Sequence, residues 1–151
     1  MRIKIAVAAA FACAGMAGPA TLAHAGLFSA TGPLIVILAD DLFLGEAEGH
    51  LGGAGTLVMH AQKYPALTCS GEFTSSATAG GAGQLRCTDG TTATFHFQRL
   101  SVFRGYGAGV TSRGSMSFSY GLTYQEAAPY LKVPGGKQLW HNGTELALAD
   151  L

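Results

Sequence analysis

Polar and apolar residues alternate along several stretches of the chain, and this period of two is typical of β-strands with one buried face. Within residues 92–97, Ala93, Phe95 and Phe97 fall on one face and polar residues on the other. Residues 33–38 instead carry the continuous run Leu-Ile-Val-Ile-Leu, which has the composition of a buried strand. Asp89-Gly90 and Asn142-Gly143 separate such segments and are tight-turn signals. The pattern predicts an antiparallel meander of hairpins.

One short helix is expected after the strands. Thr123 and Glu126 have the spacing of a capping box, and Pro129 and Pro134 keep the helix short. We therefore predict an all-β domain of about eight to ten strands, closed as a small barrel or packed as a sandwich. One or two helical turns are expected to plug one end.

A weak internal repeat supports the hairpins. Gly-Ala-Gly-x-Leu occurs at 53–57 and again 28 residues later at 81–85, and a fainter third copy spans residues 105–118. Aligning the copies predicts three cross-strand pairs on the buried faces of consecutive hairpins: Phe43 with Met59, Cys69 with Cys87, and Phe103 with Phe118.

Residues 1–25 have the three parts of a secretory signal peptide. Arg2 and Lys4 carry positive charge, residues 5–14 are apolar, and Ala23-His24-Ala25 is a small-x-small cleavage site. The apolar run is shorter than the roughly 20 residues that span a bilayer, so no transmembrane segment is expected in the mature chain. We predict an exported protein, periplasmic or else secreted, with a single β-rich domain at 26–151.

Export changes the interpretation of the cysteines. Cys13 would leave with the leader, and Cys69 and Cys87 would then remain in an oxidising compartment, where two cysteines most often form a disulfide. Closing this short loop should stabilise the fold by about 3 kcal/mol. A free nucleophilic thiolate is then not expected at either position.

Charge excludes some partners. Without Arg2 and Lys4, seven basic residues stand against nine acidic ones, a net charge of −2. Only 12% of the chain is charged, so no basic surface for nucleic acid is expected. The glycines at 105, 107 and 109 are followed by no helix pattern, which argues against a nucleotide-phosphate loop.

Few residues suggest catalysis or metal binding. Glu48 and His50 share a strand face, and His60 would lie on the partner strand, so these three are the weak candidates for a metal site. The carboxylates at 40–41 and 46/48 are the only pairs that could serve glycoside hydrolysis. No Gly-x-Ser-x-Gly motif occurs, and we predict no cofactor.

Aromatic residues gather in the last third of the chain and are the better candidates for binding. Tyrosine and tryptophan at a rim can stack on sugars or peptides. The alternative is that they pack in the core or cap a barrel end. The candidate surface consists of Tyr106, Tyr120, Tyr124 and Trp140.

Residues 42–131 include the motifs Cys-Ser-Gly-Glu-Phe at 69–73 and Ser-Phe-Ser-Tyr-Gly-Leu at 117–122. With these motifs the segment resembles a group of small exported proteobacterial proteins of unknown function. It implies an exported β-rich fold and supplies no activity. Residues 81–90 are also similar to a MORN repeat in their glycine spacing, but Ala-Thr-Phe at 93–95 departs from that family's aromatic-x-Gly. We take this second likeness as one of hairpin geometry only.

Three functional hypotheses follow. The first is a structural or binding module of the cell envelope, stapled by one disulfide, with an envelope protein or a glycan as its partner. The second is a small periplasmic hydrolase that uses carboxylates or a metal. The third is a carrier of a small ligand, which requires an apolar cavity inside a barrel.

Export and oxidation predict one intact mass. Protein recovered from the periplasm should have the denatured mass of residues 26–151 less two hydrogens, because the leader is cleaved and Cys69 is joined to Cys87. Mass spectrometry with and without a reductant measures both features. A longer chain would contradict the export prediction, and an unoxidised chain would contradict the disulfide.

Overall fold

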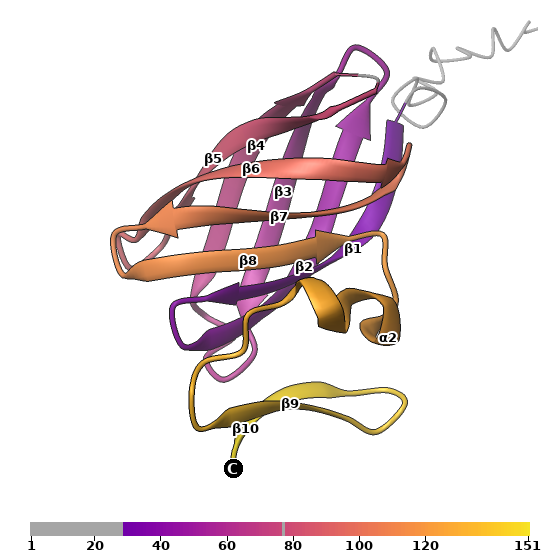
Figure 1. Ribbon diagram of the computed structural model, residues 1–151. Coiled ribbons are helices and arrows are strands. Elements are labelled where there is room, and N and C mark those ends of the chain that lie inside the picture. Colours follow the sequence, from indigo (N-terminus) through magenta and orange to yellow (C-terminus); the bar gives the residue numbers. More distant parts are fainter. Residues whose placement is uncertain (1–28, 77) are drawn as a thin grey trace, which may run out of the picture.

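Eight consecutive strands close into a barrel in the computed structural model, which describes residues 29–76 and 78–151 (Figure 1). The predicted leader lies outside these described residues. The barrel strands are β1 Ser29–Leu38, β2 Asp41–His50, β3 Ala54–Ala61, β4 Thr68–Ser75, β5 Gly80–Cys87, β6 Thr92–Ser101, β7 Arg104–Thr111 and β8 Gly114–Tyr120. After them come α2 Tyr124–Ala127, the 3-10 turn η1 Ala128–Tyr130, and the hairpin strands β9 Lys137–His141 and β10 Leu146–Asp150.

Each barrel strand pairs antiparallel with the next one in sequence, and β8 closes the barrel by pairing with β1. Leu34 of β1 lies opposite Tyr120 of β8, and Leu38 lies opposite Met116. The predicted all-β class, the meander and the single short helix are therefore confirmed, and the fold is a barrel rather than a sandwich. The capping box is also present, since the Thr123 and Glu126 side chains each bond the other residue's backbone N–H.

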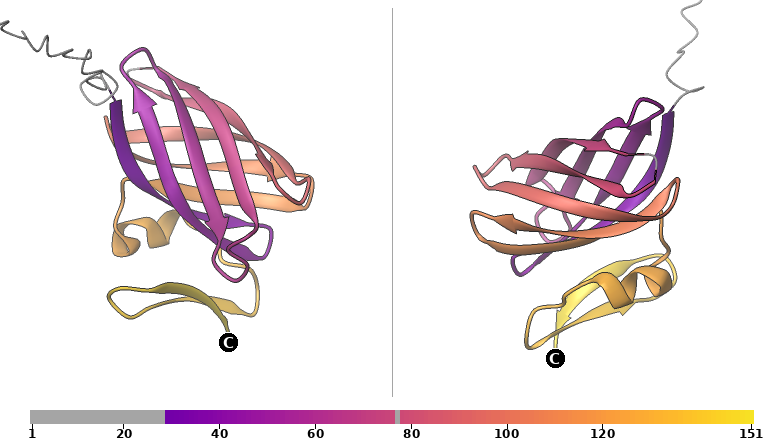
Figure 2. Two further views of the ribbon diagram at one scale, coloured as in Figure 1. Left: turned by 180° about the vertical axis from the view of Figure 1, so that it is seen from behind. Right: turned by 45° about the horizontal axis from the view of Figure 1, so that its top comes forward.

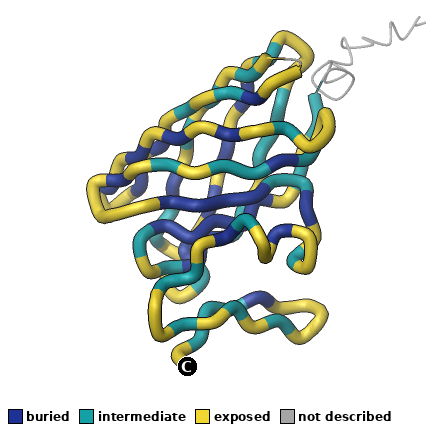
Figure 3. Tube along the Cα trace, in the orientation of Figure 1, coloured by how far each residue is buried: buried dark blue, intermediate teal, exposed yellow. Residues whose placement is uncertain are grey.

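The inside of the barrel is built from aromatic rings that lie over glycines. Figure 3 shows how buried and exposed positions alternate along much of the wall. Five inward-pointing aromatic side chains each face a glycine directly across one strand boundary. The pairs are Phe73 with Gly55, Phe95 with Gly83, Phe97 with Gly81, Phe118 with Gly107, and Tyr120 with Gly105.

The glycines are needed because the rings occupy the space that a side chain would fill. A Cβ atom built on Gly55 would lie 2.1 Å from the ring of Phe73, and one on Gly107 would lie 2.5 Å from the ring of Phe118. Gly105, Gly107 and Gly109 of β7 all point into the barrel in this way. The Gly-x-Gly-x-Gly sequence thus serves close packing inside a strand.

Strand β1 is buried on both faces, which explains its continuous apolar run. Leu34, Val36 and Leu38 join the barrel interior. Ile35 and Ile37 point outward and are covered by a second apolar cluster. That cluster also contains Leu42, Leu122, Ala127, Leu131 and Leu146, so α2, η1 and the β9–β10 hairpin pack on the outer wall.

The expected position of the helix is therefore wrong. Figures 1 and 2 show α2 beside the barrel rather than across its end. Ala127 of α2 is fully buried against the outer cluster. The physical reason is that β1 carries more apolar surface than the barrel interior can hold, and the C-terminal segment buries the excess.

The repeat predicts one cross-strand pair of the three correctly. Cys69 lies directly opposite Cys87, and the two form a disulfide inside the barrel. Phe43 and Met59 are both buried on adjacent strands, but Phe43 faces Ala61 and Met59 faces Gly45, so they are two residues out of register.

The third pair is wrong. Phe103 lies in the turn between β6 and β7 and is 60% exposed, whereas Phe118 faces Gly107. Phe103 has no partner on β8 because it precedes β7, which begins at Arg104, and the pairing of β7 with β8 starts at Gly105 opposite Tyr120.

A methyl group at Gly107 should destabilise the barrel. The new Cβ of Gly107→Ala would lie 2.2 Å from the His96 carbonyl oxygen as well as against Phe118. We expect a loss of about 1–3 kcal/mol in the free energy of unfolding, measured by urea denaturation.

Gly49→Ala is the matched control, because a Cβ there meets nothing within 4 Å. This variant should be neutral or up to about 1 kcal/mol more stable, since alanine restricts the unfolded chain. Equal stability of the two variants would contradict the packing of rings over glycines.

Candidate binding cavity

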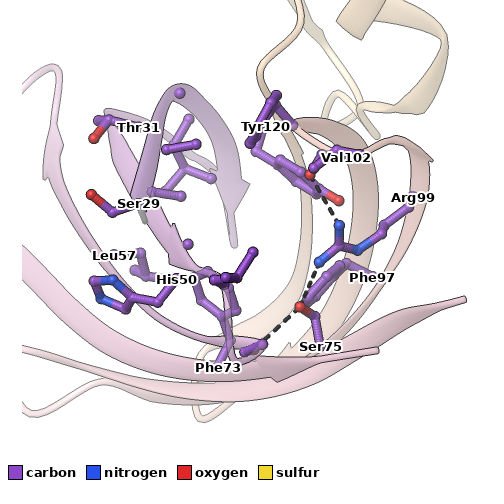
Figure 4. A pocket seen from close by; sticks show the side chains of 18 of the residues that line it. Ser29, Thr31, His50, Leu57, Phe73, Ser75, Phe97, Arg99, Val102 and Tyr120 are labelled. Carbon is purple, nitrogen blue, oxygen red and sulfur yellow. Dashed lines mark hydrogen bonds between the residues drawn. The ribbon is translucent and has the colours of Figure 1, made fainter. Parts of the chain in front are cut away.

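The barrel encloses a cavity of about 520 Å³ at the end where the β2–β3 and β6–β7 turns lie (Figure 4). The opposite end is filled. Phe43, Met59 and Cys69 are fully buried there, and the disulfide crosses from β4 to β5. The cavity is thus a pocket with one floor and one mouth.

Small residues on one wall create this space. The large rings of β4, β6 and β8 line one side of the cavity, while β1, β2 and the β2–β3 turn contribute short side chains. Those short residues are Ala30, Gly32, Ala47, Gly49, Gly52 and Gly53. Because glycine and alanine here have no ring packed over them from the facing strand, the interior stays open.

The walls below the mouth are mainly apolar. Leu34, Leu57, Phe95 and Phe118 are all buried and line the cavity. Phe97 also lines it, with its ring 5.6 Å from the rings of both Phe73 and Tyr120 in edge-to-face geometry. Such a surface favours an apolar guest.

Arg99 brings a positive charge into this apolar cavity. It follows Phe95 and Phe97 on the inner face of β6, and Figure 4 shows its guanidinium held at the cavity wall. Nη1 donates to the Val102 carbonyl at 3.0 Å, and Nη2 donates to the Ser75 hydroxyl at 2.6 Å. The Nε atom is buried and has no hydrogen-bond partner among the described residues.

Tyr120 places a hydroxyl group on the same wall. Its side chain and that of Arg99 both face Gly105 of the intervening strand, one from each side. Since Gly105 has no side chain, the phenol ring of Tyr120 lies across β7 and reaches the Phe97 ring of β6. The hydroxyl oxygen is buried without a hydrogen-bond partner in the described structure.

Burial raises the pKa of the Tyr120 phenol, and the nearby positive charge of Arg99 lowers it to a smaller extent. The phenol is therefore protonated at neutral pH and can donate a hydrogen bond. Cavity-lining residues include no Asp or Glu within the described chain, so the charge of Arg99 has no carboxylate partner there.

One of the four aromatics of the predicted binding surface lies inside the barrel, and the other three lie outside it. Only Tyr120 lines the cavity. Tyr106 stacks on Tyr130 at 4.0 Å on the outside of β7, and Tyr124 stacks on His141 at 4.8 Å beside the C-terminal hairpin. Trp140 is 47% exposed on β9. Tyr120 therefore does not share a surface with the other three.

The three weak metal candidates are also not brought together. His50 Nδ1 lies 4.0 Å from the Glu48 carboxylate at the rim of the cavity. Glu48 faces Thr56 across the β2–β3 boundary, and His60 stands four residues further along β3, bonded to Thr68 at 3.1 Å. Within residues 29–76 and 78–151, no group of three His, Cys, Asp or Glu side chains could hold a metal ion.

The carboxylates considered for a hydrolase do not converge on the cavity. Asp41 lies at the filled end, 3.4 Å from Arg113, which also approaches Asp89 at 3.5 Å. Hydrogen bonds from Thr91, followed by the charge of Arg113, lower the pKa of Asp89. Glu46 is exposed on the outer face of β2. These groups stabilise turns and strands rather than form a concave acidic site.

Comparisons of the chain with family models, curated sequences and solved structures give no match. No helix in the described part of the chain is long and apolar enough to cross a membrane. The function is therefore argued from the cavity alone. Sequence reasoning missed Arg99, although the alternation of Ala93, Phe95 and Phe97 already places residue 99 on the same inner face.

The raised pKa of Tyr120 gives a testable pH dependence. Because the folded state holds this proton more tightly than the unfolded chain, the contribution to stability is complete below pH 10 and declines as the pH rises further. Tyrosinate absorbance is measured against pH for the wild-type protein and for Tyr120→Phe. The difference between the two curves gives the titration of the Tyr120 phenol.

In Arg99→Leu the same group should titrate at still higher pH, since the cation that lowers its pKa is gone. If Tyr120 ionised at the ordinary phenol pKa of 10.0 in both the wild type and Arg99→Leu, the effect of burial on its pKa would be contradicted.

Proposed function

We propose that this protein is an exported binding protein that holds one small, mainly apolar ligand inside its barrel. The observation that carries the proposal is the cavity of about 520 Å³, open at one end and lined chiefly by apolar side chains. Cavities of roughly 300–1,000 Å³ with a few polar groups are typical of small-molecule sites. Of the three hypotheses from the sequence, only the ligand carrier requires this cavity.

The mouth of the cavity supports the proposal. Leu51 in the β2–β3 turn is 82% exposed, and Val102 and Phe103 in the β6–β7 turn are 63% and 60% exposed. All three line the cavity at its rim. Exposed apolar side chains cost solvation free energy, and at a rim they suit contact with an apolar molecule that enters.

The packing of the filled end supports it as well. The Cys69–Cys87 disulfide and the buried Met59 fill the floor of the cavity. A floor that is already packed spares the ligand the cost of ordering the protein. Export to the periplasm, which we infer from the leader and the disulfide, would place such a carrier among apolar solutes outside the cytoplasm.

The proposal predicts one site for a neutral apolar dye. Nile red should bind with a stoichiometry of one and with enhanced fluorescence, because the cavity excludes water from it. Ala47→Phe should abolish most of this binding, since a ring at this position fills the cavity opposite Gly32.

Glu46→Phe is the matched control. It adds the same ring one residue away on the outer, exposed face of β2 and should leave the affinity within about twofold. Fluorescence titration measures both variants. Dye binding that is equally strong in both would show that the dye binds outside the barrel and would contradict the proposal.

A further inference from the structure

We propose that the ligand is an amphipathic monocarboxylate, with its carboxylate at Arg99 and Tyr120 and its apolar tail toward the floor of the cavity. This inference rests on the proposed function and deepens it. It assigns a binding role to two residues that otherwise have unexplained polar atoms.

The first argument is the unpaired charge of Arg99. A cation in an apolar cavity is unfavourable unless an anion or several hydrogen bonds compensate it. Two of the five guanidinium N–H groups bond to Val102 and Ser75, and the buried Nε has no partner in the described structure. A bound anion would supply the opposite charge and accept from the two Nη N–H groups that have no hydrogen-bond partner among the described residues.

The second argument is the hydroxyl of Tyr120. Its oxygen is buried and unpartnered in the described chain, and its ring lies across Gly105 toward the strand that carries Arg99. The neutral phenol donates a hydrogen bond and does not repel an anion. Once the phenol turns toward the cavity, Arg99 and Tyr120 can share the two oxygens of one carboxylate.

The third argument sets the charge and the orientation of the ligand. Arg99 is the one basic residue lining the interior in the described chain, since His50 stands at the rim beside Glu48. A single negative charge balances it. Between Arg99 and the floor, the cavity walls are formed by Leu34, Leu57, Phe95 and Phe118, so the other end of the ligand must be apolar.

Ser75 fixes the position of Arg99. Its hydroxyl accepts from Nη2 and donates to the Gly53 carbonyl at 3.2 Å, and its backbone N–H donates to the same carbonyl. The guanidinium is therefore tied to the β2–β3 turn before any ligand binds. A fixed cation loses little side-chain entropy on binding, which favours selective recognition of the anion.

Three ligands with one common tail test the inference by isothermal titration calorimetry. Decanoate should bind the purified protein about 10- to 100-fold more tightly than decanol, because hydrogen bonds between charged groups add to the common apolar contact. Decylamine, which carries a positive charge, should bind more weakly than decanol.

Variants locate the effect. Arg99→Met should lower the affinity for decanoate about 10- to 100-fold and should lower that for decanol by a much smaller factor. Tyr120→Phe should lower decanoate affinity about 3- to 10-fold. Arg86→Met removes the same charge from the exposed outer face of β5 and should change neither ligand. Retained decanol binding also shows that each variant has kept its barrel.

The failures of the two proposals are distinguishable. If decanol and Nile red bind but decanoate binds no more tightly than decanol, the anion inference is wrong and the carrier stands. The anion inference is equally wrong if Arg99→Met and Arg86→Met weaken decanoate binding to the same extent. If no tailed ligand binds at all, both proposals are overturned.

Discussion

The packing of aromatic rings over glycines is the interaction on which the structure depends. An eight-stranded barrel has an interior just wide enough to be filled by side chains. Five rings here each face a strand position without a side chain, as Phe95 faces Gly83 and Phe118 faces Gly107. The rings supply the buried apolar surface, and the glycines let them lie against the wall. Packing thereby explains the glycines at these five positions.

The same arrangement makes the two ends of the barrel different. At one end large side chains and the Cys69–Cys87 disulfide fill the interior. At the other, rings on β4, β6 and β8 face a wall of alanine and glycine, and a cavity of about 520 Å³ remains. Gly105 contributes both to the ring packing and to the cavity wall. Because it has no side chain, the ring of Tyr120 can lie across β7 toward the strand that carries Arg99. The placement of glycines opposite aromatic rings therefore shapes both the core packing and the candidate site.

The outer wall of the barrel near β1 is covered by the C-terminal segment. Ile35 and Ile37 of β1 are covered by residues after β8, among them Ala127 and Leu131. Among the described residues, α2 lies beside the barrel and not across its end, so it does not cover the mouth (Figure 2). The described rim of the cavity includes the β2–β3 and β6–β7 turns, which carry the exposed Leu51 and Val102.

The sequence alone determined the strands, their antiparallel order and the disulfide, because alternation, Asp-Gly turns and paired cysteines are local signals. It misplaced Phe103 and the helix, and it missed Arg99, although the inner face of β6 was predicted through Phe97. The positions of Phe103 and of the helix, and the surroundings of Arg99, follow only from the closed barrel. Register around a barrel and the choice between inner and outer apolar surface depend on strands distant in sequence, as when β8 returns to pair with β1. An arginine becomes a candidate ligand-binding group only when those strands surround it with apolar walls.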